Sequence, residues 1–222
     1  MTSPRVPGLL LWPLLVTIVL SCLRLAAEVK GMVTANSGGS GSPFGIVWLV
    51  FVFGAWFGLR LARAGSRPRI RPGWLWSMLA ACGLVAAVLW AFQQVSFTDQ
   101  SDAAYEVLRG AVLRVVLVAV GLTVALSFVW PRLSWTLLLY GLGARLTVVA
   151  LTCLAKVQGW NTHYTKFGPA GIERGFGETM LSAGIAQLGI WVPFTVIAGG
   201  AVGSMVGALA APRTASVGGR LS

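Results

Sequence analysis

Charged residues are scarce in this chain, and acidic ones are the scarcest. Only 10% of the 222 residues are charged, with six Asp or Glu against seventeen Lys or Arg. Soluble domains carry roughly 25% charged residues. With 56% hydrophobic residues and a mean hydropathy of +0.80, this chain could not cover a water-exposed surface with polar atoms. Intrinsic disorder is excluded too, because disordered chains are poor in apolar residues. The composition predicts an integral membrane protein.

Metal-binding and catalytic side chains are also few. The chain has one histidine, His163, and three cysteines, Cys22, Cys82 and Cys153, each within an apolar run. A single histidine excludes a haem held by two histidines of this chain, and no ligand cluster has the spacing of a zinc or di-iron site. We therefore expect no metal and no cofactor, and cysteines that are buried as small apolar residues without forming a disulfide framework.

Long apolar runs, in contrast, are abundant. A bilayer core about 30 Å thick requires about 20 apolar residues per helix. Six stretches qualify, at approximately residues 8–27, 44–63, 74–93, 107–130, 133–155 and 181–210. The sequence predicts one all-α domain over residues 1–222, a bundle of six transmembrane helices. A cleaved signal peptide is the alternative for the first run, but Arg24 and Leu25 make a poor cleavage site, which favours a retained helix.

Positive charge is concentrated between the second and third runs. The loop at residues 60–73 has five arginines and no acid, and all six acidic residues fall on the opposite side once the spans alternate. The positive-inside rule places this loop and both termini in the cytoplasm. We expect a multi-pass protein of the bacterial inner (plasma) membrane. The net charge of +11 then reflects topology, and no nucleic-acid partner is expected.

Two arginines are out of place deep within predicted spans. Arg114 lies in the fourth and Arg145 near the centre of the fifth. A charge at the bilayer centre costs about 2.5–3.5 kcal/mol on insertion scales, so such residues usually face a protein interior or an aqueous cavity. Their distances from Pro131 predict depths within about 4–5 Å of each other. Both are candidate sites for an anion or a lipid phosphate, and the alternative is a structural role, with Arg114 paired to Glu106.

The predicted outer loop, residues 156–180, contains the single histidine. Its candidate binding residues are Trp160, Asn161, His163 and Tyr164, and its carboxylates include Glu173 and Glu178. Loops of this length in compact folds are usually functional or disordered, and the aromatic residues argue against disorder. His163 could act as a general base oriented by either carboxylate. The alternative is a structured cap in which His163 is only hydrogen-bonded.

Small residues recur every four positions in the last predicted span. Gly199, Gly203 and Gly207 share one helix face, which allows a neighbouring helix to approach closely. The pattern predicts helix packing, either within the monomer or between two copies.

Three hypotheses of function follow. The leading one is a non-catalytic accessory or assembly subunit, because no catalytic set is evident. Such a subunit would pack against partner membrane proteins or a second copy of itself, and against anionic lipid. The first alternative is a small carrier or channel for an anionic or lipid-phosphate solute that uses Arg145 and Arg114. The second is an outer-face membrane enzyme that uses His163.

Overall fold

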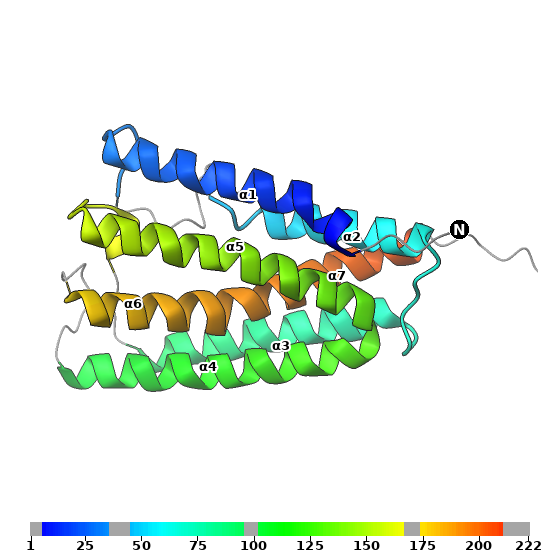
Figure 1. Ribbon diagram of the computed structural model, residues 1–222. Coiled ribbons are helices and arrows are strands. Elements are labelled where there is room, and N and C mark those ends of the chain that lie inside the picture. The colour runs from blue at the N-terminus through cyan, green and yellow to red at the C-terminus, as the bar shows by residue number, and fades with distance from the viewer. Residues whose placement is uncertain (1–5, 36–44, 96–101, 167–173, 211–222) are drawn as a thin grey trace, which may run out of the picture.

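The computed structural model describes residues 6–35, 45–95, 102–166 and 174–210. Over these ranges the chain is helical and contains no strand, which confirms the predicted all-α class. The long helices run side by side along one axis (Figure 1). In chain order the elements are α1 (Val6–Val29), α2 (Leu49–Arg63), α3 (Gly73–Gln94), α4 (Asp102–Val129), α5 (Pro131–Val157), the 3-10 turn η1 (His163–Thr165), α6 (Phe176–Gly184), the π-helical η3 (Ile185–Trp191) and α7 (Val192–Leu209).

Within the described ranges, five helical segments are long and apolar enough to cross a membrane. They are Gly8–Val29, Gly73–Gln94, Glu106–Val129, Pro131–Val157 and Phe176–Leu209. The second predicted span, residues 44–63, differs. Residues 45–48 form a bend and a turn. Helix α2 has only 15 residues, so its length is about 22 Å. A bilayer core is about 30 Å thick, so regular helix in α2 is too short to cross it.

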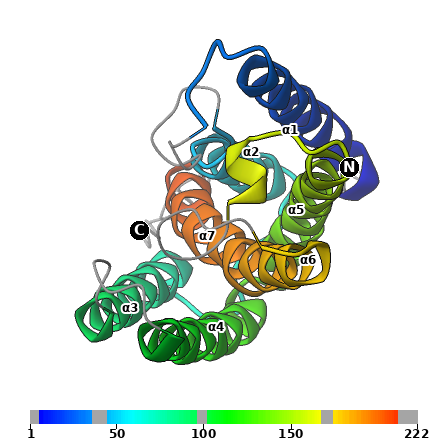
Figure 2. The same cartoon turned by 90° about the vertical axis from the view of Figure 1, so that its left-hand side faces the viewer.

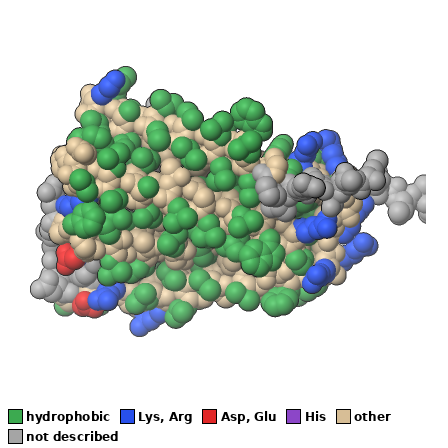
Figure 3. All heavy atoms as spheres, viewed as in Figure 1, with side chains coloured by type: hydrophobic (Ala, Val, Ile, Leu, Met, Phe, Trp, Pro, Cys, Tyr) green, Lys and Arg blue, Asp and Glu red, His purple; other side chains and the backbone are tan. Residues whose placement is uncertain are grey.

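The bundle has two chemically different ends. The arginine end contains the α2–α3 loop and the α4–α5 turn, and the cap end contains η1 and the start of α6. Glu28, Glu106 and Glu178, the acidic residues whose side chains the structure describes, all lie at the cap end. In Figure 3 the visible acidic side chains lie only at the left, whereas basic side chains occur at both ends and form a group at the right.

Helix α7 occupies the centre of the bundle. It contacts α2, α3, α4 and α5. Viewed along the bundle axis, it lies between the α3–α4 hairpin and the group formed by α1, α2 and α5 (Figure 2). In the most apolar 18-residue stretch of each segment, 61% of the residues are buried in Phe176–Leu209, against 22% in Gly73–Gln94. The last helical segment is therefore the core, and α3 lies at the periphery.

Helices α2 and α7 approach each other backbone to backbone. A Cβ atom added to Gly54 would lie 2.5 Å from the carbonyl oxygen of Gly199, and one added to Gly58 would overlap the carbonyl group of Gly203. At Gly207 an added Cβ would lie 2.7 Å from the Trp130 ring. The structure thus places the small-residue face of the last span against neighbours in the same chain.

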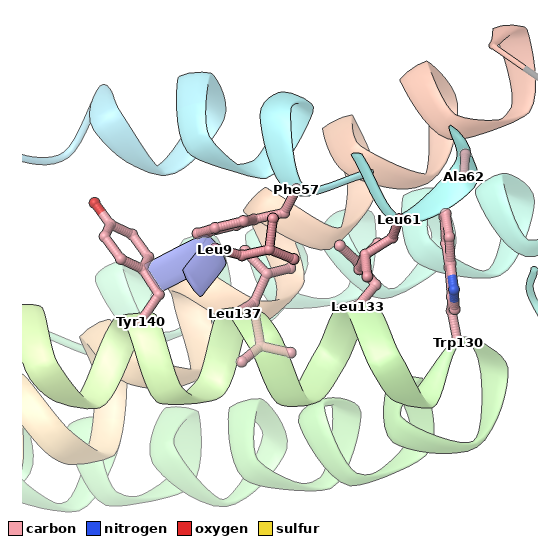
Figure 4. Close-up of a cluster of buried hydrophobic side chains, with 9 residues drawn as sticks. Leu9, Phe57, Leu61, Ala62, Trp130, Leu133, Leu137 and Tyr140 are labelled. Atoms are coloured by element: carbon pink, nitrogen blue, oxygen red, sulfur yellow. The ribbon is translucent and has the colours of Figure 1, made fainter. Parts of the chain in front are cut away.

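The largest apolar cluster lies between α2 and α5 (Figure 4). Leu133, Leu137 and Tyr140 share one face of α5 and point toward Phe57 and Leu61 of α2. The rings of Phe57 and Tyr140 meet edge to face, with centroids 5.6 Å apart. Helices inside a bilayer gain little from the hydrophobic effect, so close packing of this kind holds them together.

The final helical segment is irregular before Pro193. Proline lacks an amide hydrogen and cannot bond to the carbonyl group of Gly189, four residues earlier. The π-helical turn η3 occupies this position, and such widened turns are a known cause of helix bends. Trp191, the last residue of η3, lies against Arg145 of α5.

The expected burial of the cysteines is wrong for two of them. Cys22 and Cys82 are exposed on helix surfaces, and Cys153 is half-buried; all three are free thiols. An apolar run in a membrane helix does not identify a buried face, because the face turned toward lipid is apolar as well.

Candidate functional site

One face of α1 is polar and buried. Thr17, Ser21, Arg24 and Glu28 are spaced by four, three and four residues, so they lie along one side of the helix, and each is at most 5% exposed. Thr17 and Ser21 donate hydrogen bonds to carbonyl groups one turn earlier. The Thr17 hydroxyl also lies 2.8 Å from the hydroxyl of Tyr140 on α5. Polar groups therefore continue from the middle of the bundle to the cap end.

Glu28 connects α1 to the segment around η1, residues 160–166, which we call the cap. Its carboxylate accepts a hydrogen bond from Arg24 Nε at 2.9 Å and one from the backbone N–H of His163 at 3.0 Å. His163 Nδ1 lies 2.5 Å from Glu28 Oε1, the oxygen that also contacts Arg24. The Glu28 side chain is completely buried. Buried charges require pairing and hydrogen bonds of this kind, and we call Arg24, Glu28 and His163 the cap triad.

Tyr164 anchors the cap inside the bundle. Its hydroxyl lies 3.4 Å from the carbonyl oxygen of Ser21, and its ring packs against Leu25 and Val148. Burial raises the pKa of the Tyr164 hydroxyl, and the negative charge of Glu28 raises it further. The part of the predicted outer loop around Tyr164 is therefore folded and packs against α1 and α5.

The structure gives the candidate loop residues different roles. His163 is partly buried in the triad, and its ring lies 3.9 Å from that of Tyr164, centroid to centroid. Trp160 packs beside the cap, and Asn161 is exposed. Glu178 is exposed on α6, and Glu173 lies outside the described residues. The carboxylate in contact with His163 belongs to Glu28. The inter-helix segment is also shorter than predicted, because α5 continues to Val157 and α6 begins at Phe176.

Arg145 lies inside the bundle. It is 4% exposed, and its guanidinium carbon lies 4.9 Å from the centre of the Trp191 ring. Among the described residues, Nε of Arg145 has no hydrogen-bond partner and no carboxylate is within ion-pair distance. A desolvated cation–π contact contributes about 2 kcal/mol. The arrangement leaves a buried donor available for an anion.

Arg114 lies in different surroundings. It is exposed on α4, and its guanidinium carbon lies 5.6 Å from the ring centre of Trp90 on α3. An exposed cation–π contact contributes about 0.5–1 kcal/mol. The two arginines that the sequence groups together therefore meet different tryptophans, one at the surface and one in the interior.

The polar face of α1 is not among the sites that the sequence predicts above, although its signal is present in the residue spacing. Arg24 and Glu28 are spaced as an i, i+4 pair, and Thr17 and Ser21 continue the same helix face toward the centre of the span. Glu28 was placed just outside the first span, whereas α1 continues to Val29 and includes it. A charged pair at the end of an apolar helix, on the same face as two hydroxyls, indicates a buried polar face.

Comparisons of the chain with protein-family models, with curated proteins and with solved structures found no match. The fold and composition define its class: an all-helical protein whose described ranges contain five helical segments long and apolar enough to span a membrane, which suggests a multi-pass membrane protein. Those same ranges contain no group of three or more His, Cys, Asp or Glu side chains that could hold a metal ion.

Proposed function

We propose that this protein is a non-catalytic accessory or assembly subunit of a membrane complex. The observation that supports the proposal is the closed arrangement of the cap triad. Both carboxylate oxygens of Glu28 are engaged, and Nδ1 of His163 is held against one of them. The Glu28 carboxylate, which could accept a proton in a reaction, is used instead to fasten the cap to α1. In the proposed role these contacts are structural, and the protein has no turnover of its own.

In the proposed topology the chain crosses a bacterial inner membrane six times, with the arginine end in the cytoplasm. The positive-inside rule supports this orientation. Helix α2 and the residues before it supply the sixth crossing. Irregular backbone is tolerated at membrane depth where protein covers it, and Leu49 and Val50, at the start of α2, are 2% and 1% exposed.

The α3–α4 hairpin is the proposed partner surface, because it contributes least to the core. Its outward side chains are large and apolar, including Leu89, Leu117 and Phe128, which are 58%, 72% and 63% exposed. In a membrane such a surface binds another helix through close van der Waals packing. Anionic lipids are the proposed neighbours of the arginine end.

Native mass spectrometry of the protein, extracted gently from its own membrane, tests the proposal. We expect partner membrane proteins in fixed stoichiometry, and we expect their yield to fall when Leu117 and Phe128 are changed to Ala. Exchange of the buried Ala119 for Ser provides a control on the same helix that leaves the outward surface intact. A purified monomer with robust turnover of its own would contradict the proposal.

Arg145 favours a second candidate function, a small carrier or channel for an anionic or lipid-phosphate solute. The supporting observation is the unsatisfied Nε of a buried guanidinium beside a π-helical turn, a feature that often occurs at functional sites. In liposomes, Arg145→Gln should abolish anion flux and Arg145→Lys should weaken it. Arg114→Gln is the matched control, and equal flux in the wild type and both Arg145 variants would exclude this function.

A further inference from the structure

The arginine end contains a hollow of about 270 Å³ between the α2–α3 loop and the α4–α5 turn. Its lining includes Ser66, Arg67, Arg69, Trp130, Pro131 and Arg132. We propose that this hollow binds a phosphate group, either in the headgroup of an anionic phospholipid or as free phosphate. The lipid form of the proposal rests on the proposed function, because it requires the arginine end to lie at a membrane surface.

The hollow is held in shape by hydrogen bonds on both walls. The backbone N–H of Arg69 donates to the carbonyl oxygen of Val129 at 2.8 Å. Trp130 Nε1 donates to the hydroxyl of Ser66 at 3.0 Å, and both of these residues are buried. The loop is thus tied to the turn on either side of Arg67. Arg67 and Arg69 lie on one wall and Arg132 on the other, so the backbone that carries all three arginines is held in place without a ligand.

The charge of the hollow matches a phosphate. Its lining contains arginines and no acidic residue, and the acidic side chains that the structure describes lie at the opposite end of the bundle. Like charges held close together repel one another, and a bound anion relieves that repulsion. A guanidinium group also presents paired N–H donors that match two phosphate oxygens. The three arginines therefore favour phosphate over a simple halide ion.

Helix α5 adds to this preference. It begins at Pro131, on the wall of the hollow, and its N-cap residue Trp130 makes no side-chain capping hydrogen bond. The first N–H groups of a helix have no intrahelical acceptor, and the helix dipole is positive there. In a chain that spans a membrane, a basic hollow at this level is suited to a lipid headgroup.

The test uses native mass spectrometry of the full-length protein in detergent, titrated separately with dioleoylphosphatidylglycerol, dioleoylphosphatidylcholine and inorganic phosphate. The hollow variant carries Arg67→Gln, Arg69→Gln and Arg132→Gln. The control variant loses the same charge at the same end, outside the lining, through Arg60→Gln, Arg63→Gln and Arg71→Gln. Single variants, Arg132→Gln and Arg63→Gln, provide the same comparison if a triple variant does not fold.

We expect phosphatidylglycerol to bind the hollow variant about tenfold more weakly than the wild type, with the control variant within about twofold of the wild type. Phosphatidylcholine should not distinguish the variants. If inorganic phosphate shows the tenfold loss and phosphatidylglycerol does not, the ligand is free phosphate. Equal losses in both triple variants, or no binding of either anion to the wild type, would overturn the site. That result leaves the proposed function intact if partner proteins still co-purify.

Discussion

One oxygen of the Glu28 carboxylate contacts both Arg24 Nε and His163 Nδ1, and His163 lies 135 residues further along the chain. The same carboxylate accepts the backbone N–H of His163 through its other oxygen. A single buried side chain therefore joins the last turn of α1 to the cap. The position of the cap depends on α1, and the stability of both depends on the charge of Glu28.

Replacing Glu28 with glutamine should destabilise the protein strongly. The amide keeps the shape of the side chain but removes the negative charge that faces the buried Arg24 guanidinium. Removing one partner of a buried ion pair costs about 3–5 kcal/mol, so we expect the free energy of unfolding to fall by about 3 kcal/mol, measured by denaturant unfolding in detergent. Glu106→Gln is the control: Glu106 is 67% exposed and 3.6 Å from Arg109, and its change should be within about 0.5 kcal/mol. Equal effects of the two substitutions would contradict the buried pair.

His163→Ala should loosen the cap and leave the bundle folded. The substitution removes the ring contact with Glu28 and keeps the backbone N–H bond. Hydrogen exchange should become faster in residues 160–166 and stay unchanged in α3 and α4, while Asn161→Ala, at an exposed neighbour, should have little effect. Loss of a measurable turnover in His163→Ala with unchanged exchange in the cap would assign the histidine to catalysis.

Gly58→Ala should separate α2 from α7. Its Cβ would occupy the position of the Gly203 carbonyl group, and such overpacking against backbone costs about 3 kcal/mol. Gly121→Ala is the matched control on α4, where an added Cβ meets nothing within 4 Å and alanine raises helix propensity by about 1 kcal/mol. Thermal unfolding in detergent should show a lower midpoint for the first variant and an equal or higher one for the second. A lower midpoint for Gly121→Ala but not for Gly58→Ala would contradict the close approach of α2 and α7.

Tyr164→Phe should reduce the loss of stability at alkaline pH. Burial raises the pKa of Tyr164 above its ordinary value of 10.0 in the folded protein. Between the unfolded and folded pKa values the folded state binds more protons than the unfolded state, so the free energy of unfolding decreases as the pH rises above about 10. Denaturant unfolding between pH 8 and 11 should show a shallower decline for Tyr164→Phe than for the wild type. An unchanged slope would place the hydroxyl in water.

Hydropathy predicted the helices that cross the bundle, because each must bury about 20 apolar residues whatever its neighbours are. It was less accurate for α2. There the run at residues 44–63 is apolar enough, but residues 45–48 turn before regular helix begins at Leu49. Composition alone does not locate such a helix start.

The contacts of the polar residues were harder to predict, because they depend on helix rotation. Arg114 and Arg145 have equivalent sequence surroundings, yet one is exposed and the other buried. Both faces of a membrane helix are apolar, so periodicity does not show which face is inside. The pairing of Glu28 with His163 likewise requires α1 and the cap to meet in three dimensions, and no local pattern specifies that contact.

The central position of α7 has a consequence for biosynthesis. Ribosomes release the chain from its N-terminus, so α2 and α3 are synthesised before the helix that both of them contact. Gly54 and Gly58 present exposed backbone until Gly199 and Gly203 arrive to cover it. The bundle can close only when its last apolar segment has been inserted. An insertase or chaperone that shields this face of α2 would therefore act from the synthesis of α2 until α7 docks.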